Sequence, residues 1–501
     1  MRETLDPLTR HLVLPQPDGE RAGSALIAAI LRHARVKPHA EAIGEVETSG
    51  RTCTYGELAR LIGVRATYLR ERVAPGDGLL VIYPAGVDYV AWFCAAIAAG
   101  LHVLPMHPQV AGPEALAVAG RANIRAALIS PGVASAESLH HLTLKGSAEI
   151  GNGECGVNLS RTDVLHGAGS VVLGSSGTTG LPKLALRESR SLDATAAAIV
   201  KGMGLTAEDR VVFSTPLSHS YGVDVLLGVL AAGAALRVMP RFDAELLAGE
   251  IEGGATVLPG VPFVFEALAR RAPRREVALR VAVSAGSALS QRVRREFIKV
   301  WGVQVGQLFG ATELGTVAVS LPGSEGFEPT SVGRPLAGVS MRVVNIKEPS
   351  QSVEVGSEGH LAVRAPSMLT QYLDGDLPLV DGHLLTGDLA RMDQSGNIWI
   401  TGRLKLLIDV GACKVNPLEV EGVINIHPGV AESVVVPLAA SETVHRLRAV
   451  VVLHPAERPP TAEELRRFVR ERLSPIKVPR VVEIVTSLPK SPTGKVIRDR
   501  V

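Results

Sequence analysis

The N-terminal part of this chain alternates short apolar runs with segments of helical periodicity. Two of the apolar runs, residues 79–82 and 126–129, contain no polar position, so a strand formed by either run needs cover on both faces. Residues 23–36 and 55–73 have the helical periodicity that supplies such cover. This alternation predicts an α/β fold with a large N-terminal domain of doubly wound parallel sheets.

The same alternation continues through the middle of the chain. A helix is predicted at residues 187–203, and strands are predicted at 210–213, 280–287 and 304–308. Small or polar residues end or follow these strands. In a doubly wound sheet, the loops at the carboxyl ends of the strands gather at one edge and form the ligand site. We therefore expect the functional residues at this edge.

From about Val339 the pattern changes to short strands separated by turns that contain Gly or Asp. These strands are predicted at residues 340–344, 360–363, 383–385 and 397–400. Their close spacing indicates a small β-barrel-like part rather than further strand–helix units.

The last hundred residues predict a small α+β domain. Its elements follow the order helix, strand, strand, helix and strand, at residues 418–426, 431–436, 446–453, 461–473 and 480–484. We therefore divide the chain into an N-terminal domain, residues 1–403, and a C-terminal domain, residues 404–501.

Composition excludes several classes of function. Hydrophobic residues at 46% and charged residues at 20% are typical of a globular protein. A net charge of +2 and only 4% aromatic residues do not favour binding to nucleic acid or to an anionic membrane surface. The acidic N-terminus does not resemble a signal peptide, and the apolar helix predicted at residues 90–99 is shorter than the roughly 20 residues of a membrane span. Four scattered cysteines, without a CxxC pair, predict neither a zinc site nor disulfides and fit a reducing cytoplasm.

A glycine-rich loop follows the strand predicted at residues 170–173. It reads Gly174-Ser175-Ser176-Gly177-Thr178-Thr179-Gly180-Leu181-Pro182-Lys183. Glycines let backbone N–H groups approach a ligand closely, and successive N–H groups, hydroxyls and one lysine suit a polyphosphate. The spacing is not that of a P-loop. A linker rich in Gly, Ser and Thr is the alternative interpretation of this stretch alone.

Several further motifs, in one order, give the chain a family resemblance. The chain resembles the adenylate-forming superfamily, which contains acyl- and aryl-CoA synthetases, peptide-synthetase adenylation domains and luciferases, and it is most similar in style to a stand-alone acyl- or aryl-CoA synthetase. Besides the glycine-rich loop, the motifs are Thr54-Tyr55-Gly56-Glu57-Leu58, Phe309-Gly310-Ala311-Thr312-Glu313, Gly333-Arg334-Pro335, Thr386-Gly387-Asp388, Gly402-Arg403-Leu404-Lys405 and Ser491-Pro492-Thr493-Gly494-Lys495.

The resemblance implies a set of nucleotide-binding residues. The loop up to Lys183 would hold the β- and γ-phosphates, Phe309 would lie along the adenine, and Asp388 would accept the ribose hydroxyls beside Arg403. The complete set is Ser175, Ser176, Gly177, Thr178, Thr179, Gly180, Lys183, Ser287, Phe309, Gly310, Thr312, Asp388 and Arg403.

The resemblance also implies the groups that act on the phosphates. Thr312 would contact the α-phosphate, and Glu313 would hold Mg²⁺, a cation that prefers oxygen ligands. Lys495, on the C-terminal lid domain, would reach the carboxylate and the α-phosphate. Each of these residues alone has an ordinary alternative: Glu313 as a cap, Asp388 as a turn former, and Lys495 as a solvated lysine.

The acid substrate would bind near the start of the helix predicted at residues 223–232. The expected pocket residues are His219, Ser220, Tyr221, Val261, Phe263 and Gly286. His219 is also a candidate catalytic residue, although a lone histidine can equally be a core or cap residue. Amino-acid-activating members bind the α-ammonium group with a carboxylate here, whereas Asp224 would point elsewhere on the helix. We therefore expect an aryl, alicyclic or fatty acid.

Lys405 occupies the hinge position of the family, and Gly411 and Ala412 border the expected thiol channel. Five residues depart from the family pattern: Leu184 and Ala412 replace glycines, Ser189 replaces a histidine, Leu406 replaces an acidic residue and Asp409 replaces a lysine. These departures suggest that one half-reaction is weak or that the acid or thiol partner is specialised.

The resemblance implies an AMP-forming acid–thiol ligase of secondary or acyl metabolism that uses ATP and Mg²⁺ and transfers the acyl group to coenzyme A. Two alternatives stay open: an enzyme that loads a carrier protein, and a protein that binds adenylate without catalysis. The sequence does not identify the acid or the oligomeric state.

Overall fold

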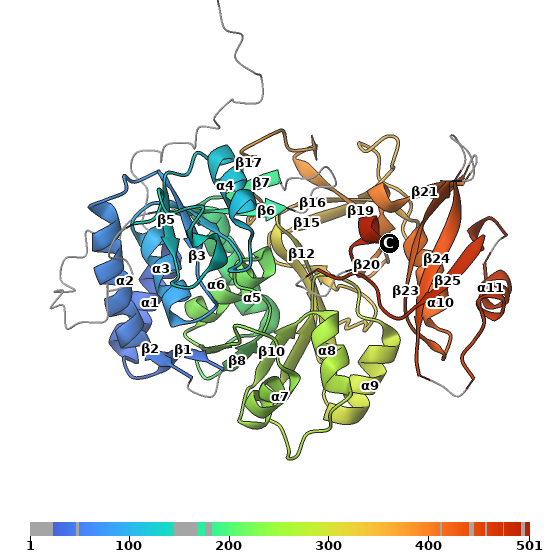
Figure 1. The fold of residues 1–501 in the computed structure, drawn as a ribbon, viewed down its shortest axis with the longest axis horizontal. Helices are drawn as coiled ribbons and strands as arrows, with labels where there is room; N and C mark the ends of the chain where they lie inside the picture. The colour runs from blue at the N-terminus through green and yellow to red at the C-terminus, as the bar shows by residue number, and fades with distance from the viewer. Residues whose placement is uncertain are drawn as a thin grey trace, which may run out of the picture.

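The computed structural model describes residues 24–46, 50–144, 168–175, 183–410, 413–439, 445–455, 458–473, 475–491 and 496–501. Two large sheets with their helices form most of the chain, a smaller antiparallel sheet follows, and the C-terminal residues form a separate sheet with two helices (Figure 1). The α/β fold expected from the alternating pattern is confirmed.

The first large sheet has nine strands in the order β14-β13-β12-β11-β10-β8-β9-β1-β2. Strands β12 to β1 run parallel, whereas β2, β13 and β14 are antiparallel to their neighbours. The bounds are β1 Glu41–Glu45, β2 Thr52–Thr54, β8 Arg210–Phe213, β9 Ala235–Val238, β10 Val257–Gly260, β11 Val281–Ser284, β12 Val305–Ala311, β13 Gly315–Ser320 and β14 Arg334–Pro335.

The second large sheet has six strands in the order β17-β7-β6-β4-β3-β5. Its strands are β3 Gly78–Ile82, β4 His102–Pro105, β5 Ala126–Ile129, β6 Ser170–Ser175, β7 Lys183–Arg187 and β17 Gln371–Tyr372. Every residue of β3 and β5 is buried, as their continuous apolar runs predicted. The helix predicted from residue 187 begins at Ser189 instead, because Arg187 pairs with β6 and ends β7.

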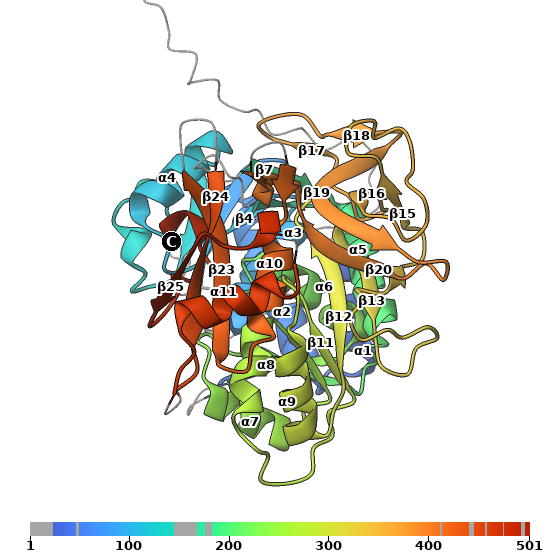
Figure 2. The same cartoon turned by 90° about the vertical axis from the view of Figure 1, so that its right-hand side faces the viewer.

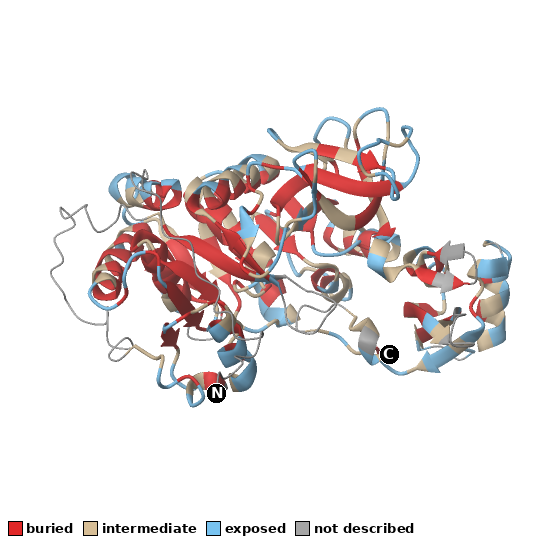
Figure 3. Cartoon of the chain, turned by 90° about the horizontal axis from the view of Figure 1, so that it is seen from above, coloured by how far each residue is buried: buried red, intermediate tan, exposed pale blue. Residues whose placement is uncertain are grey.

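Helices cover both sheets on both faces. Five of them share one core between the sheets: α1 Ala25–Val36, α2 Tyr55–Arg70, α3 Val87–Ala98, α5 Ser189–Met203 and α6 Ser220–Ala232. On the far face of the nine-stranded sheet lie α7 Ala244–Glu252, α8 Pro262–Ala269 and α9 Gln291–Trp301, and α4 Gly112–Arg121 lies on that of the six-stranded sheet. Figure 3 shows the buried residues concentrated in these strands and inner helix faces.

The apolar helix predicted near residues 90–99 is α3, which is buried along its whole length. Within the described ranges, no helix combines the length and the hydropathy needed to cross a membrane.

The short strands predicted after Val339 form a five-stranded antiparallel sheet. Its strands are β15 Ser340–Val344, β16 Gly359–Arg364, β18 Leu379–Val380, β19 His383–Met392 and β20 Ile398–Arg403. Strand β20 leads into a 3-10 turn, Leu404–Leu406, where the sequence predicted the domain boundary.

The C-terminal residues keep the predicted order of elements, preceded by a hairpin that the sequence pattern did not predict (Figure 2). The hairpin strands are too short to show a period. The bounds are β21 Ile408–Val410, β22 Cys413–Val415, α10 Pro417–Asn425, β23 Val430–Ala439, β24 His445–Leu453, α11 Ala462–Arg470 and β25 Val481–Val485. Both helices and the sheet share one small core.

The start of α2 explains the Thr54-to-Leu58 motif. The Thr54 hydroxyl accepts a hydrogen bond from Glu57 N at 3.3 Å, and the Glu57 carboxylate accepts one from Thr54 N at 2.8 Å. This reciprocal pair is a capping box, which satisfies two backbone donors at the helix start.

We expect Thr54→Ala to lower the free energy of unfolding by about 1 kcal/mol, because the helix loses its N-cap. Thermal or denaturant unfolding measures the change. Thr52→Ala, at an exposed strand position outside the box, is the control and should change stability by less than about 0.5 kcal/mol. Equal losses in the two variants would contradict a capping role.

Candidate active site

Strands β6 and β7 hold the two ends of the glycine-rich loop. Ser175 at the end of β6 pairs with Lys183 at the start of β7 in an antiparallel register. Residues 176–182, which include the predicted Ser176, Gly177, Thr178, Thr179 and Gly180, lie outside the described residues. The structure therefore fixes where the loop leaves the sheet and where it returns.

Tyr372 contacts both Lys183 and Glu313. The Lys183 ammonium stands 4.7 Å from the centre of the Tyr372 ring, and the Tyr372 hydroxyl donates a hydrogen bond to Glu313 Oε1 at 2.6 Å. Sequence analysis did not select Tyr372, because the two-residue strand β17 is too short to show a pattern. The contacts bring together two residues that stand 130 positions apart in the chain.

The structure has room for a leucine at position 184, where the family pattern has glycine. Its side chain is fully buried in the core on the outer face of the six-stranded sheet. Its backbone N–H donates to Asp374 Oδ1 at 3.0 Å, its carbonyl accepts from Leu373 N at 2.8 Å, and Asp374 is also paired with Arg121. Leu184 therefore anchors the returning strand β7.

The turn between β12 and β13 presents the Phe309-to-Glu313 motif. Phe309 and Gly310 belong to β12, and Thr312 and Glu313 form the turn. A Cβ on Gly310 would lie 2.6 Å from the carbonyl oxygen of Gly315, which explains why glycine stands there. The turn therefore holds Thr312 beside Glu313, and both are half-buried.

Asp388 and Arg403 meet across β19 and β20. They are register partners, and Arg403 Nε donates to Asp388 Oδ1 at 2.7 Å. Asp388 is 3% exposed, and its backbone N–H donates to the Thr386 hydroxyl at 3.0 Å. Next to it, Gly387 N donates to His360 Nε2 at 2.8 Å, and burial lowers the pKa of His360, which favours the neutral ring that accepts this bond. The carboxylate is thus held in one orientation beside a cation.

The predicted acid pocket begins at the N-terminus of α6. His219 is the N-cap residue, and Ser220 and Tyr221 begin the first turn. The Tyr221 ring packs against Phe213 with centroids 5.6 Å apart, and its buried hydroxyl has no hydrogen-bond partner among the described residues. Burial, and secondarily Asp224, raises the pKa of Tyr221, so the phenol keeps the proton that it can donate.

The other predicted pocket residues follow β10 and β11. Val261 and Gly286 lie close together, since a Cβ on Gly286 would be 3.7 Å from Val261 Cγ1. Gly286 has φ +82°, which glycine adopts without strain, and the following Ser287 is exposed. Phe263 is 42% exposed, and its ring packs edge-on against Phe242 with centroids 4.8 Å apart. Its ring is therefore anchored by a neighbouring aromatic side chain.

Asp224 does not serve the pocket opening. Its buried carboxylate accepts from Arg187 Nη1 at 2.7 Å and from the Thr316 hydroxyl at 3.1 Å. The Asp224 side chain therefore points into the core, where Arg187 and Thr316 are also buried. This agrees with the expectation that it points away from the predicted acid pocket.

Gly411 and Ala412, predicted to border a thiol channel, and the predicted catalytic Lys495 also lie outside the described residues. The chain on either side of Lys495 is held firmly. Lys490 forms a β-bridge with Val496, and Arg498 makes two hydrogen bonds of 2.6 and 2.7 Å to the carboxylate of Glu421.

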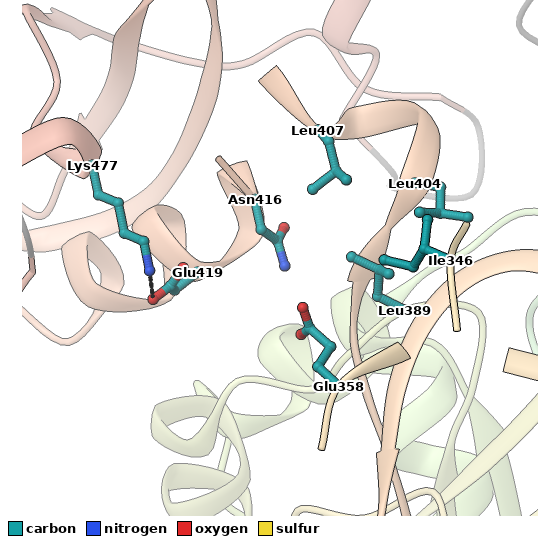
Figure 4. Close-up of a pocket in the computed structure, with 8 residues that line it drawn as sticks. All are labelled: Ile346, Glu358, Leu389, Leu404, Leu407, Asn416, Glu419 and Lys477. Carbon is teal, nitrogen blue, oxygen red and sulfur yellow. Dashed lines mark hydrogen bonds and ion pairs between the residues drawn. The ribbon is translucent and has the colours of Figure 1, made fainter. Parts of the chain in front are cut away.

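A cavity of about 480 Å³ lies beside the predicted hinge, between the five-stranded sheet and the C-terminal elements (Figure 4). Lys405 is exposed in the 3-10 turn. Across the hinge, Asn416 Nδ2 donates to the carbonyl of Thr401 at 2.8 Å, and a side chain on Gly402 would overlap Asn416. The cavity is lined by Ile346, Glu358, Leu389, Leu404, Leu407, Asn416, Glu419 and Lys477.

Through the described ranges, no three His, Cys, Asp or Glu side chains gather as a multidentate metal cluster. Glu313 is a half-buried carboxylate with one oxygen oriented by Tyr372, and it is chemically suited to a hard cation that also takes phosphate oxygens as ligands.

Comparison with known proteins shows similarity along nearly the whole chain. The profile of the AMP-binding enzyme family matches residues 30–373, and that of the AMP-binding enzyme C-terminal domain matches residues 419–495. The chain is 29% identical to 4-coumarate–CoA ligase-like 3 of Oryza sativa subsp. japonica, over 88% of this chain and 82% of that protein. It is 27% identical to the fatty acid–[acyl-carrier-protein] ligase ScoC of Streptomyces coeruleorubidus, over 93% of each chain.

Among solved structures, ATP-bound MatB from Rhodopseudomonas palustris matches with a TM-score of 0.83 at 24% identity. The match covers 95% of this chain and 99% of MatB. At 24% identity, this match is evidence for a shared fold alone.

His219 is expected to be neutral at pH 7. Although it reaches solvent, desolvation by the surrounding protein lowers its pKa, and nearby His107 lowers it further. The unfolded chain therefore binds this proton more readily than the folded one. Its stabilising contribution is complete above the unfolded pKa of about 6.5 and decreases as the pH falls through 6.5 toward the lower folded value.

An NMR titration of the imidazole should give a pKa below 6.5 for His219, assigned by its loss in His219→Gln. Unfolding measured from pH 8 to 5 should show a smaller loss of stability in that variant than in the parent chain. A titration at or above pH 6.5 would contradict the expected desolvation.

Proposed function

The chain belongs to the family of AMP-binding enzymes, and we propose that it activates a carboxylic acid with ATP and transfers the acyl group to the thiol of coenzyme A. The observation that carries this proposal is the meeting of Lys183 and Glu313 around Tyr372. A cation from the end of a glycine-rich loop and a carboxylate from a strand-end turn suit the two sides of a metal-bound polyphosphate.

In the first half-reaction, a carboxylate oxygen attacks the α-phosphorus and pyrophosphate leaves. Asp388, fixed beside Arg403, would accept hydrogen bonds from the ribose hydroxyls. Phe309 would lie along the adenine, and Thr312 would donate to the α-phosphate. Glu313 would hold Mg²⁺, which supplies positive charge to the phosphates when it is bound.

Lys495 would supply the second cation. Attack of a carboxylate on a phosphate brings two anions together, and a positioned positive charge lowers this barrier. The bridge from Lys490 to Val496 and the pair of Arg498 with Glu421 hold both ends of the segment that carries Lys495. Lys183 would then steady the leaving pyrophosphate.

In the second half-reaction, the thiol attacks the acyl carbon and AMP leaves. We propose that the C-terminal domain reorients about Lys405 between the two steps, so that residues 411–412 border the entering thiol. The hydrogen bond from Asn416 to the carbonyl of Thr401 lies at this hinge and stabilises the observed orientation.

The pairing of Asp224 with Arg187 supports an acid without an α-ammonium group, because this carboxylate is already occupied. His219, Tyr221, Val261 and Gly286 would line a pocket for an aryl, alicyclic or fatty acid. The Tyr221 hydroxyl would donate to a polar group of that acid. The free, buried thiols of Cys53 and Cys94, whose pKa values burial raises to about 12, support a reducing compartment, and we propose a cytoplasmic location.

A carrier protein is the alternative thiol partner. The similarity to ScoC, whose name states an acyl-carrier-protein as acceptor, favours this candidate. A screen for pyrophosphate release across carboxylic acids, followed by thioester formation with coenzyme A or a pantetheinylated carrier protein, separates the two. Faster transfer to the carrier would replace coenzyme A in the proposal. ATP binding without pyrophosphate release from any acid would favour a non-catalytic adenylate-binding protein.

We expect Lys495→Ala to reduce pyrophosphate release by a factor of about 10² to 10³, with the dissociation constant for ATP changed by less than about threefold. Pyrophosphate release and calorimetric ATP binding measure the two quantities. Lys490→Ala is the matched control, because Lys490 lies in the same segment and pairs with Glu432 at 2.8 Å. An undiminished rate in Lys495→Ala would remove Lys495 from the mechanism.

We expect Tyr372→Phe to raise the Mg²⁺ concentration required for half-maximal activity by about tenfold, because a hydrogen bond to a charged group contributes about 1.5–3 kcal/mol. The retained ring keeps the contact with Lys183. A Mg²⁺ titration at fixed ATP tests this expectation. Tyr372→Leu, which also removes the ring, should show a further loss, and no change in either variant would separate Tyr372 from the metal.

A further inference from the structure

Arg187 is a fully buried arginine at the end of β7, four residues after Lys183. Its Nη1 donates to Asp224 Oδ1 at 2.7 Å, its Nη2 donates to the Thr195 hydroxyl, and its Nε donates to the Ser191 hydroxyl at 3.4 Å. A single buried cation therefore joins the strand after the glycine-rich loop to helices α5 and α6.

Asp224 extends this network to the turn that carries Thr312 and Glu313. Its Oδ2 accepts from the hydroxyl of Thr316, the second residue of β13. Asp224 also stands three residues after Tyr221, on the same side of the first turns of α6. The same carboxylate thus contacts β7 and β13 from the helix that begins the predicted acid pocket.

The turn itself packs against the arginine. Gly315 has φ +64°, and a Cβ there would lie 2.7 Å from both Arg187 Nη2 and the Thr195 hydroxyl. Below the turn, Ser191 donates to the carbonyl of Ser367 at 2.5 Å, and the Ser367 hydroxyl donates to the carbonyl of Leu314 at 2.6 Å. The guanidinium occupies the space that a side chain at residue 315 would need.

We propose that Arg187 and Asp224 are positioning residues that fix the first turn of α6, and with it the acid pocket, relative to the nucleotide-binding turn. The expected effect on the KM for the acid rests on the proposed function. Neither residue contacts the predicted substrates; each acts through the elements that it joins.

We expect the position of the acid pocket to depend on the Arg187–Asp224 pair more than the position of the nucleotide-binding turn does. The nucleotide turn has other anchors: Tyr372 donates to Glu313, and Leu369 N donates to the carbonyl of Glu313 at 2.8 Å. Within the part of the chain that the structure describes, the side-chain hydrogen bonds from α6 to β7 and β13 are those of Asp224. Removing the pair should therefore displace the acid without removing the ATP site.

The decisive variant is Arg187→Met combined with Asp224→Val. Apolar replacement of a complete buried ion pair commonly preserves stability, whereas removal of one partner leaves a buried charge uncompensated. We expect the double variant to unfold within a few degrees of the parent chain. Its KM for the acid found in the pyrophosphate-release screen should rise about tenfold or more, while its ATP dissociation constant changes by less than about threefold.

The conservative variant Asp224→Asn should show the opposite pattern. Its amide oxygen can still accept from Arg187 and its NH2 group can donate to the Thr316 hydroxyl, so the acid KM should stay near that of the parent, while the unfolding temperature falls. The control is Asp209→Asn, which breaks the ion pair of Asp209 with Arg280. These two residues directly precede β8 and β11, at the amino ends of the strands and therefore away from the loops that follow the strands. It should lower stability and leave the acid KM unchanged.

Amide hydrogen exchange over residues 219–226 gives a readout that needs no substrate. Exchange in the first turn of α6 should become at least about tenfold faster in the double variant and stay unchanged in Asp209→Asn. If the parent chain activates no acid, the proposed function fails, and the exchange result still decides whether the pair positions α6. A folded double variant with unchanged exchange, or with unchanged acid KM in an active enzyme, would overturn the inference.

Discussion

The antiparallel pairing of Ser175 with Lys183 is the constraint on which the site depends. It closes the glycine-rich loop at its base, so a lysine returns beside the strand from which the loop departed. Because β7 then pairs with β17 on its other side, Tyr372 is brought against Lys183. The predicted phosphate-binding and metal-binding groups are placed by main-chain hydrogen bonds between strands, and their side chains complete the contact.

The two remaining parts of the site are built on different supports. Asp388 and Arg403 are register partners on a pair of antiparallel strands, which gives their side chains a fixed separation. The residues of the predicted acid pocket lie instead on the first turn of α6 and on the loops after β10 and β11. A helix can shift along a sheet more easily than one strand can shift against a hydrogen-bonded neighbour. The buried Arg187–Asp224 pair would oppose such a shift, because it joins α6 to β7.

Much of the fold could be predicted from particular sequence patterns. The continuous apolar runs at β3 and β5, and the helix–strand order of the C-terminal residues, agree with the structure because burial on one or both faces dictates them. Arg187 was wrongly assigned to the start of a helix, because a charged residue is not expected at a buried strand position. Its partner Asp224 lies 37 positions away in the sequence. Tyr372 was missed because its strand has two residues, and its partners are distant in the sequence.

The pairing of β7 with β17 also has a consequence for the order in which the protein is made. Leu184 and Asp374 are in contact across 190 positions of the sequence. During synthesis, the ribosome must therefore add about 190 more residues before β17 can pair with the free edge of β7. Until then, β7 presents unpaired backbone groups of the kind that promote association between chains. Until this edge closes, the nascent chain can associate with other chains through the same strand that begins where the glycine-rich loop ends.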